Sequence, residues 1–280
     1  MRLAVLRIAY RRIQSALYTR LFSSRAGPAS GVERNPIRPG YLIAVYRLRN
    51  SALMERVVND AERAGLRVGL WSLDECSPSL RRVTLDVGPG SRTQILTQLD
   101  HKMRESAEEF VLVTDDDFEF VHGDLATFVQ TATQCGFMLS QPGHIPSSNC
   151  SYSFNHCRPW LTARSTTFVE AGPIVLVHPA FHSRVFPMPS NFGMGWGLEF
   201  LWLRSLSPSE RFGIVDSVWI RHLGMLAADY QCLREEVDRY DSLLRDMDLR
   251  HIKEIFKVTR VWWRWRQMPR QWAWDSESSR

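Results

Sequence analysis

Three consecutive carboxylates, Asp115, Asp116 and Asp117, follow the apolar, β-branched run 111–114. Side chains alternate along a strand, so Asp115 and Asp117 are expected on one side and Asp116 on the other. Two carboxylates about 6–7 Å apart repel each other by about 2–3 kcal/mol at an effective dielectric constant of about 20. A divalent cation offsets such repulsion, so the triplet is a candidate Mn²⁺ or Mg²⁺ site. The alternative is a solvated acidic turn, in which water screens the charges and nothing binds.

A second segment with chemistry-bearing side chains is Gly195-Trp196-Gly197, which precedes Glu199 at the start of an expected helix. The glycines let the backbone turn sharply and approach a ligand closely. The indole of Trp196 offers an apolar face to the C–H edges of a sugar ring. Glu199 is a candidate general base, whose pKa apolar neighbours raise and a helix N-terminus lowers. The alternative is a glycine-rich turn with an ordinary first-turn acid.

The elements that must position these residues have an α/β pattern. Strands are expected over 41–46, 66–73, 110–114, 167–177 and 213–220, and helices over 51–64, 91–107 and from about residue 198. Strand, helix, strand in succession predicts parallel strands with right-handed crossovers. Ligands of such sheets bind at the carboxyl ends of the strands, where the aspartates and His222 are found. The stretch 141–165 lacks periodicity and is expected to be a long, functional loop.

The two ends of the chain are basic and aromatic. Residues 1–25 contain six arginines and no acidic residue, with apolar residues at helical spacing, which predicts a basic amphipathic helix. Residues 26–40 are expected to be a linker, and residues 229–280 a helical extension rich in Trp and Arg. The net charge of +5 therefore concentrates at the ends and indicates an anionic membrane surface as partner. The alternative is that the first helix packs on the catalytic body.

Cysteine content and hydropathy indicate the compartment. Five scattered cysteines, an odd number, favour a reducing environment over a disulfide scaffold. No apolar run approaches the ~20 residues that span a bilayer, and arginines interrupt any signal peptide. We expect a cytoplasmic protein, peripheral on the cytosolic face of a membrane. Aromatic and cationic residues would also suit single-stranded nucleic acid, but an acidic cleft repels phosphates, so no nucleic acid is expected as partner.

Four segments, 113–118, 168–173, 195–199 and 213–222, resemble metal-dependent glycosyltransferases of the GT-A fold. The similarity is closest to a plant and bacterial family of uncharacterised glycosyltransferase-like domains. That family has an acidic triplet after an apolar strand, then Phe-Val-Glu, Gly-Trp-Gly-x-acid, and a Gly-Ile-Val-Asp-Ser strand leading to a histidine. The motifs occur here in the same order within residues 41–228. The resemblance implies a Rossmann-like, mixed and mostly parallel sheet flanked by helices, with helical extensions at both ends.

The resemblance also implies which residues bind the donor. An acidic motif of this kind holds Mn²⁺ or Mg²⁺, which bridges the diphosphate of a nucleotide sugar, with a UDP-sugar expected first. The metal ligands would be Asp117, Asp115 and His222. The nucleotide-binding residues would be Tyr46, Arg47, Arg92, Asp115 and Asp116.

For the acceptor, a glycan or a lipid-linked molecule, the resemblance implies an inverting transfer. Glu199 would remove the proton from the acceptor hydroxyl. Glu170, Gly195, Trp196 and Gly197 would contact the donor or acceptor sugar. Galactosyltransferases carry two adjacent acids where this chain has Glu199 alone.

Two other functions remain open. A nucleotidyltransferase also uses aspartates and metal on an α/β sheet, but usually has a Gly-rich, Lys/Arg-bearing signature near its first strand. Residues 45–49 contain no glycine, which counts against this function. A metal-dependent carbohydrate-binding module needs no base, so Glu199→Gln would leave its ligand binding intact.

Overall fold

The computed structural model describes residues 40–224, 238, 241–243, 245 and 256–263. The amphipathic helix expected over 1–25, the linker before residue 40 and most of the expected C-terminal extension lie outside the described residues. In the part of the chain that is described, no helix is long and apolar enough to cross a membrane.

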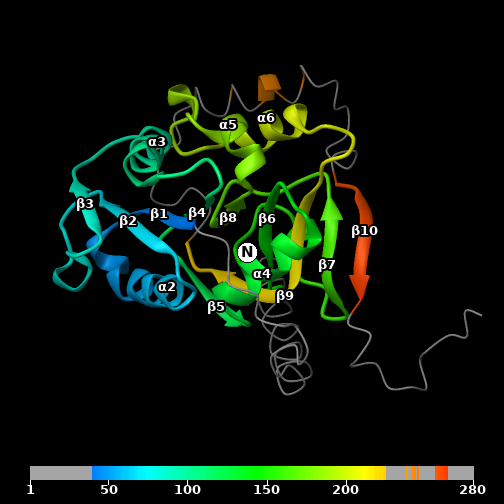
Figure 1. Ribbon diagram of the computed structural model, residues 1–280, viewed down its shortest axis with the longest axis horizontal. Helices are drawn as coiled ribbons and strands as arrows, with labels where there is room; N and C mark the ends of the chain where they lie inside the picture. The colour runs from blue at the N-terminus through cyan, green and yellow to red at the C-terminus, as the bar shows by residue number, and fades with distance from the viewer. Residues whose placement is uncertain (1–39, 225–237, 239–240, 244, 246–255, 264–280) are drawn as a thin grey trace, which may run out of the picture.

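A single mixed sheet runs through the protein (Figure 1). Its strands are β1 Gly40–Tyr46, β2 Arg67–Ser72, β3 Thr84–Val87, β4 Phe110–Thr114, β5 Phe118–His122, β6 Leu139–His144, β7 Leu161–Thr166, β8 Ile174–Val177, β9 Phe212–His222 and β10 Val258–Trp263. The order is β10-β7-β9-β6-β8-β4-β1-β2-β3, and β5 pairs with β9 outside this path. The neighbours β4-β1-β2-β3 are parallel, as expected. Beyond β4, only β6 and β9 pair in parallel among the described strands, and the other pairings are antiparallel.

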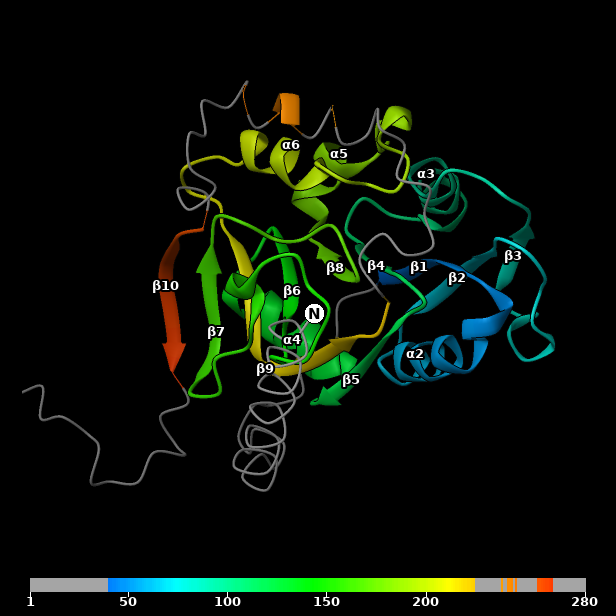
Figure 2. The same cartoon turned by 180° about the vertical axis from the view of Figure 1, so that it is seen from behind.

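Helices cover both faces of the sheet (Figures 1 and 2). They are α2 Ser51–Arg63, α3 Arg92–Met103, α4 Leu125–Cys135, α5 His182–Val185 and α6 Leu198–Ser205. Strand β1 is buried on both sides, and its alternation separates two cores. Leu42 and Ala44 pack in the core with α2 and α4, whereas Ile43 and Val45 pack in the core with α3, α5 and α6. This confirms the predicted α/β class.

Three expectations about the elements need correction. The long loop expected over 141–165 is shorter, because β6 and β7 occupy its two ends. The sequence does not predict β6, because this strand contains Pro142 and Gly143 and both residue types are rare in central strands. The strand expected over 167–177 is confined to β8. Val258–Trp263, expected in a helical extension, is the edge strand β10, as its β-branched and aromatic residues favour.

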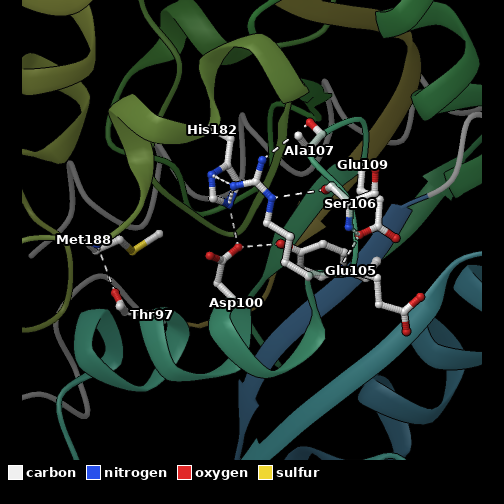
Figure 3. Close-up of polar contacts among 10 residues, drawn as sticks. Thr97, Asp100, Glu105, Ser106, Ala107, Glu109, His182 and Met188 are labelled. Carbon is white, nitrogen blue, oxygen red and sulfur yellow. Dashed lines mark hydrogen bonds and ion pairs between the residues drawn. The ribbon is translucent and has the colours of Figure 1, made fainter.

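A buried polar network attaches α3 to the sheet at the end opposite the aspartates (Figure 3). The Tyr41 hydroxyl donates to Oδ1 of Asp100 at 2.5 Å, and Nε2 of His182 donates to the same oxygen at 2.8 Å. Nη1 of Arg104 lies 2.5 Å from Nδ1 of His182. Because a guanidinium can only donate, Nδ1 of His182 accepts this hydrogen bond. The network joins β1, α3 and α5 far from the acidic triplet.

Candidate functional site

The acidic triplet lies between β4 and β5, at the carboxyl end of the parallel strands. In β4, Val111 and Val113 face the core with α3, so alternation directs Asp115 to that side. The contacts agree with this direction, because Asp115 pairs with Arg92 of α3. Asp116 turns the other way, and its Oδ2 accepts the backbone N–H of Arg47 at 2.7 Å. Burial raises the pKa of Asp116 to about 6, although that N–H opposes the rise.

Asp115 is held by Arg92, for which the resemblance implies a nucleotide contact. Nε and Nη2 of Arg92 both lie 2.7 Å from Oδ1 of Asp115. Arg92 is only 7% exposed, so this is a buried, charge-assisted pair. Burial raises the pKa of Asp115, the Arg92 guanidinium opposes that rise, and the nearby Asp117 carboxylate adds to it. The backbone N–H of Asp115 also donates to the Pro173 carbonyl at 2.7 Å, which extends the β4–β8 ladder.

Asp117 and His222 are brought together by strand pairing. His222 lies opposite Phe118 in the β5–β9 pair, and Leu223 N–H donates to the Asp117 carbonyl at 2.7 Å. Nε2 of His222 lies 3.1 Å from Oδ1 of Asp117. Its Nδ1 lies 2.7 Å from the Asn149 carbonyl, so Nδ1 carries a proton and Nε2 faces the carboxylate. Although burial favours the neutral ring, the carboxylates of Asp117 and then Asp115 raise the pKa of His222 to about 9.

Two of the three expected metal ligands fit a divalent cation. Oδ1 of Asp117 is buried, and its neighbour among the described residues is Nε2 of His222. The Asn149 carbonyl binds Nδ1 and leaves Nε2 of His222 directed at this oxygen, as backbone carbonyls that bind metal-ligating histidines do. Gly224 lets the backbone approach the Asp117 carboxylate closely, since a Cβ there would lie 1.9 Å from Oδ2 of Asp117. Within the described ranges, however, no group of three His, Cys, Asp or Glu side chains is arranged to hold a metal, and Asp115 is paired with Arg92.

Glu170 is held by the loop that precedes β7. Its Oε1 accepts the Ser151 N–H at 3.0 Å, and its Oε2 accepts Nδ2 of Asn155 at 2.6 Å. Its own N–H donates to Oε1 of Gln141 in β6 at 2.6 Å. Burial raises the pKa of Glu170, while these donors and the charge of His222 oppose the rise. The sequence does not single out Gln141, Ser151 and Asn155 as partners of Glu170, since their only signal is the polar composition of 141–165.

Glu199 occupies the first turn of α6 and is only 8% exposed. Burial raises its pKa to about 8; the backbone N–H groups at the helix start oppose this, and the neighbouring Glu170 carboxylate adds to it. Its Oε2 has no hydrogen-bond partner among the described residues. Gly195 and Gly197 have φ values of +103° and +91°, where a side chain would be strained. Trp196 between them is 36% exposed and available to a ligand.

The structure buries the side chain of Tyr46 in the hydrophobic core. Its ring is fully buried in the core with α2, and its hydroxyl lies 3.0 Å from Oγ1 of Thr84 and accepts the Ser77 N–H at 3.1 Å. A buried ring cannot stack on a nucleobase without moving, so the base contact expected of Tyr46 has no support in this arrangement. The physical reason is strand alternation, which points Tyr46 to the opposite face from Val45. Arg47, the next residue, does lie against the triplet.

Comparison with known proteins bears on the fold alone. No family model matches the chain, and no curated protein matches it. Among solved structures, the crystal structure of GalNAc-T7 with UDP, GalNAc and Mn2+ is similar, with a TM-score of 0.53 and 10% identity. The similarity covers 76% of this chain and 48% of that chain, so this chain spans about half of that protein.

A second structure, the inositol-1-phosphate CTP transferase from T. maritima, matches at a TM-score of 0.38 and 10% identity. That similarity covers 74% of this chain and 96% of the other chain. The element order, the two helical layers and the first similarity agree with one another. The chain therefore has a GT-A-like, Rossmann-type fold.

Proposed function

We propose that this chain is a glycosyltransferase that moves a sugar from a nucleoside diphosphate sugar to a hydroxyl acceptor, with inversion. The observation that carries the proposal is the grouping of side chains at the carboxyl end of the parallel strands. There, the Asp117–His222 pair lies beside the Arg92–Asp115 pair, and Glu170 is the electrostatic neighbour shared by His222 and Glu199. The two charged pairs, which could bind a metal ion and a diphosphate, therefore lie near the buried carboxyl group of Glu199.

On the donor side, Asp117 and His222 would hold Mn²⁺ or Mg²⁺, which supplies positive charge to the leaving diphosphate when bound. The proton on His222 must leave before Nε2 can bind a cation. Arg47 and Asp116, which a backbone hydrogen bond joins, would contact the nucleotide. A UDP-sugar is the first donor to test, because the similar structure of GalNAc-T7 contains UDP and Mn2+.

On the acceptor side, Glu199 would accept the hydroxyl proton. A carboxyl group with a pKa of about 8 is well matched to proton transfer near neutral pH. Gly195, Trp196 and Gly197 would form the surface on which the sugar lies, with the exposed indole against its C–H face. Glu170 would orient a sugar hydroxyl from its position beside Glu199.

An anionic membrane surface is a further proposed partner, and it fits a lipid-linked acceptor. Two tryptophans of the described chain are unusually exposed, Trp160 at 46% and Trp263 at 43%. Strand register places them at the same end of the β7–β10 pair, since Trp263 pairs with Leu161. Arg260 of β10 stacks over the ring of Trp262 at 4.8 Å. Trp and Arg together suit the headgroup region of a bilayer.

Calorimetric titration with UDP, GDP and CDP, with and without Mn²⁺, tests the proposed function. We expect one nucleoside diphosphate to bind only when the metal is present. Asp117→Ala should abolish this binding, whereas the control Asp86→Ala removes an exposed carboxylate on the edge strand β3, three strands from β4, and should leave it intact. Nucleotide binding that needs no metal, or wild-type affinity in the Asp117 variant, would contradict the proposal.

A further inference from the structure

Arg92 contacts three separate segments of the candidate site. It is the first residue of α3, and its side chain is 8% exposed. Besides Oδ1 of Asp115, its guanidinium reaches two backbone carbonyls. Nη2 donates to the Ala171 carbonyl at 3.3 Å, and Nη1 to the Met194 carbonyl at 3.5 Å. The Arg92 guanidinium therefore links the acidic triplet, the segment that carries Glu170 and the glycine loop 193–197.

The start of α3 holds the same glycine loop by two further bonds. Thr93 N–H donates to the Gly193 carbonyl at 3.1 Å, and Oγ of Ser91 donates to that carbonyl at 3.2 Å. The contact with Arg92 is tight, because a Cβ on Gly195 would lie 3.2 Å from Nη1. The glycine loop is thus seated against α3, with the Arg92 guanidinium between it and Asp115.

We propose that Arg92 is a positioning residue that couples the acidic triplet to the glycine loop. The proposal rests on the proposed function, in that the ligand at the triplet is a nucleoside diphosphate. A ligand that fixes Asp115 also fixes the guanidinium bound to it, and with it the carbonyls of Ala171 and Met194. By linkage, ordering the donor side then stabilises the glycine loop, and the reverse holds. The planar fork is essential, since a lysine ammonium cannot reach all three acceptors in one arrangement.

Hydrogen exchange of the full-length protein, with and without UDP and Mn²⁺, tests this coupling. The reporter amides are Gly195 N–H, which donates to the Phe192 carbonyl at 2.6 Å, and Leu198 N–H, which donates to the Gly195 carbonyl at 3.2 Å. In the wild-type protein we expect UDP and Mn²⁺ to slow exchange of both amides about fivefold or more. In Arg92→Lys, which keeps the charge, nucleotide should still bind, within about tenfold of wild-type affinity, but without this protection.

Arg104→Lys is the matched control, because Arg104 directly follows the other end of α3 and contacts His182. It should lower thermal stability but keep the nucleotide-induced protection. The proposal is overturned if Arg92→Lys retains the protection, or if it loses nucleotide binding while its loop amides exchange as in wild type. The latter result would make Arg92 a nucleotide contact only.

The same experiment distinguishes failure of the proposed function from failure of the positioning role of Arg92. If UDP and Mn²⁺ do not bind the wild-type protein, the ligand-free samples still test the positioning role. Faster exchange of the Gly195 and Leu198 amides in Arg92→Lys than in Arg104→Lys would support it. Equal exchange in the two variants would overturn it.

Discussion

Glu199→Gln should stabilise the protein, by an amount that grows with pH. Burial raises the pKa of Glu199 from 4.5 to about 8, so the folded protein keeps a proton that the unfolded chain has already released. Between these pH values the unfolded state binds fewer protons, and the free energy of unfolding therefore falls as pH rises. The free energy of unfolding of the wild-type protein falls by about 1.4 kcal/mol for each pH unit in this interval, and by at most about 5 kcal/mol by pH 8. Glutamine is neutral throughout and avoids this cost.

Urea unfolding followed by tryptophan fluorescence at pH 5, 6, 7, 8 and 9 measures the difference. We expect the two proteins to differ by less than about 1 kcal/mol at pH 5 and by several kcal/mol at pH 8 and above. Glu210→Gln is a control of opposite sign, because the hydrogen bond from Arg184 lowers the pKa of Glu210. Its stabilising effect is present above the unfolded pKa and is lost as pH falls, so that variant should be weaker than wild type near neutral pH.

A stability difference between Glu199→Gln and wild type that does not change with pH would refute this reasoning. So would a wild-type protein that is the more stable of the two at pH 8. Either result would mean that Glu199 is ionised at neutral pH in the folded protein, and the proposed base would then lack its tuned pKa.

Three further results are expected. Asp216→Asn should lower the free energy of unfolding, measured by urea titration, by about 3–5 kcal/mol. Nε of the buried Arg164 lies 3.6 Å from Oδ2 of Asp216, so the guanidinium would lose its counter-charge. A loss below about 1 kcal/mol would contradict this prediction. Trp196→Ala should leave nucleotide affinity within about twofold by calorimetry but slow transfer to a glycan acceptor about tenfold, since it removes the indole face proposed to pack on the sugar. An unchanged transfer rate would exclude that role. Replacing Trp160 and Trp263 by alanine should reduce co-sedimentation with phosphatidylserine vesicles, whereas Leu85→Ala, 42% exposed on the opposite edge strand, should not; equal sedimentation would remove the membrane contact.

The parallel half of the fold and the division of the triplet are readable from the sequence. Strand β4 ends at Thr114, as predicted, and period-two alternation correctly separates Asp116 from Asp115. These features depend on neighbours in the chain. By contrast, Asp117 meets His222 through the β5–β9 pairing, and no local pattern gives the partner of a strand. The carbonyl of Asn149, which orients His222, comes from a loop without periodicity.

Arg92 and β10 show two other features that local sequence patterns do not predict. An arginine at a helix start near an acidic motif is an expected phosphate contact, and only tertiary packing reveals that it binds Asp115 and the glycine loop. The run Val258–Trp263 has residues that suit both an interfacial tail and a strand. Its pairing with β7 decides between them for these residues, since Trp262 packs edge-on against Phe137 in the core.

Product analysis of the full-length protein with Mn²⁺ tests the proposed chemistry most directly. One sample contains UDP-sugars with a glycan acceptor mixture, and a second contains UTP and CTP with sugar phosphates. We expect metal-dependent release of UDP in the first sample, loss of that release in Asp117→Ala, and no pyrophosphate in the second. Release of pyrophosphate from the triphosphates, with no UDP formed from any UDP-sugar, would contradict a glycosyltransferase and favour nucleotidyl transfer.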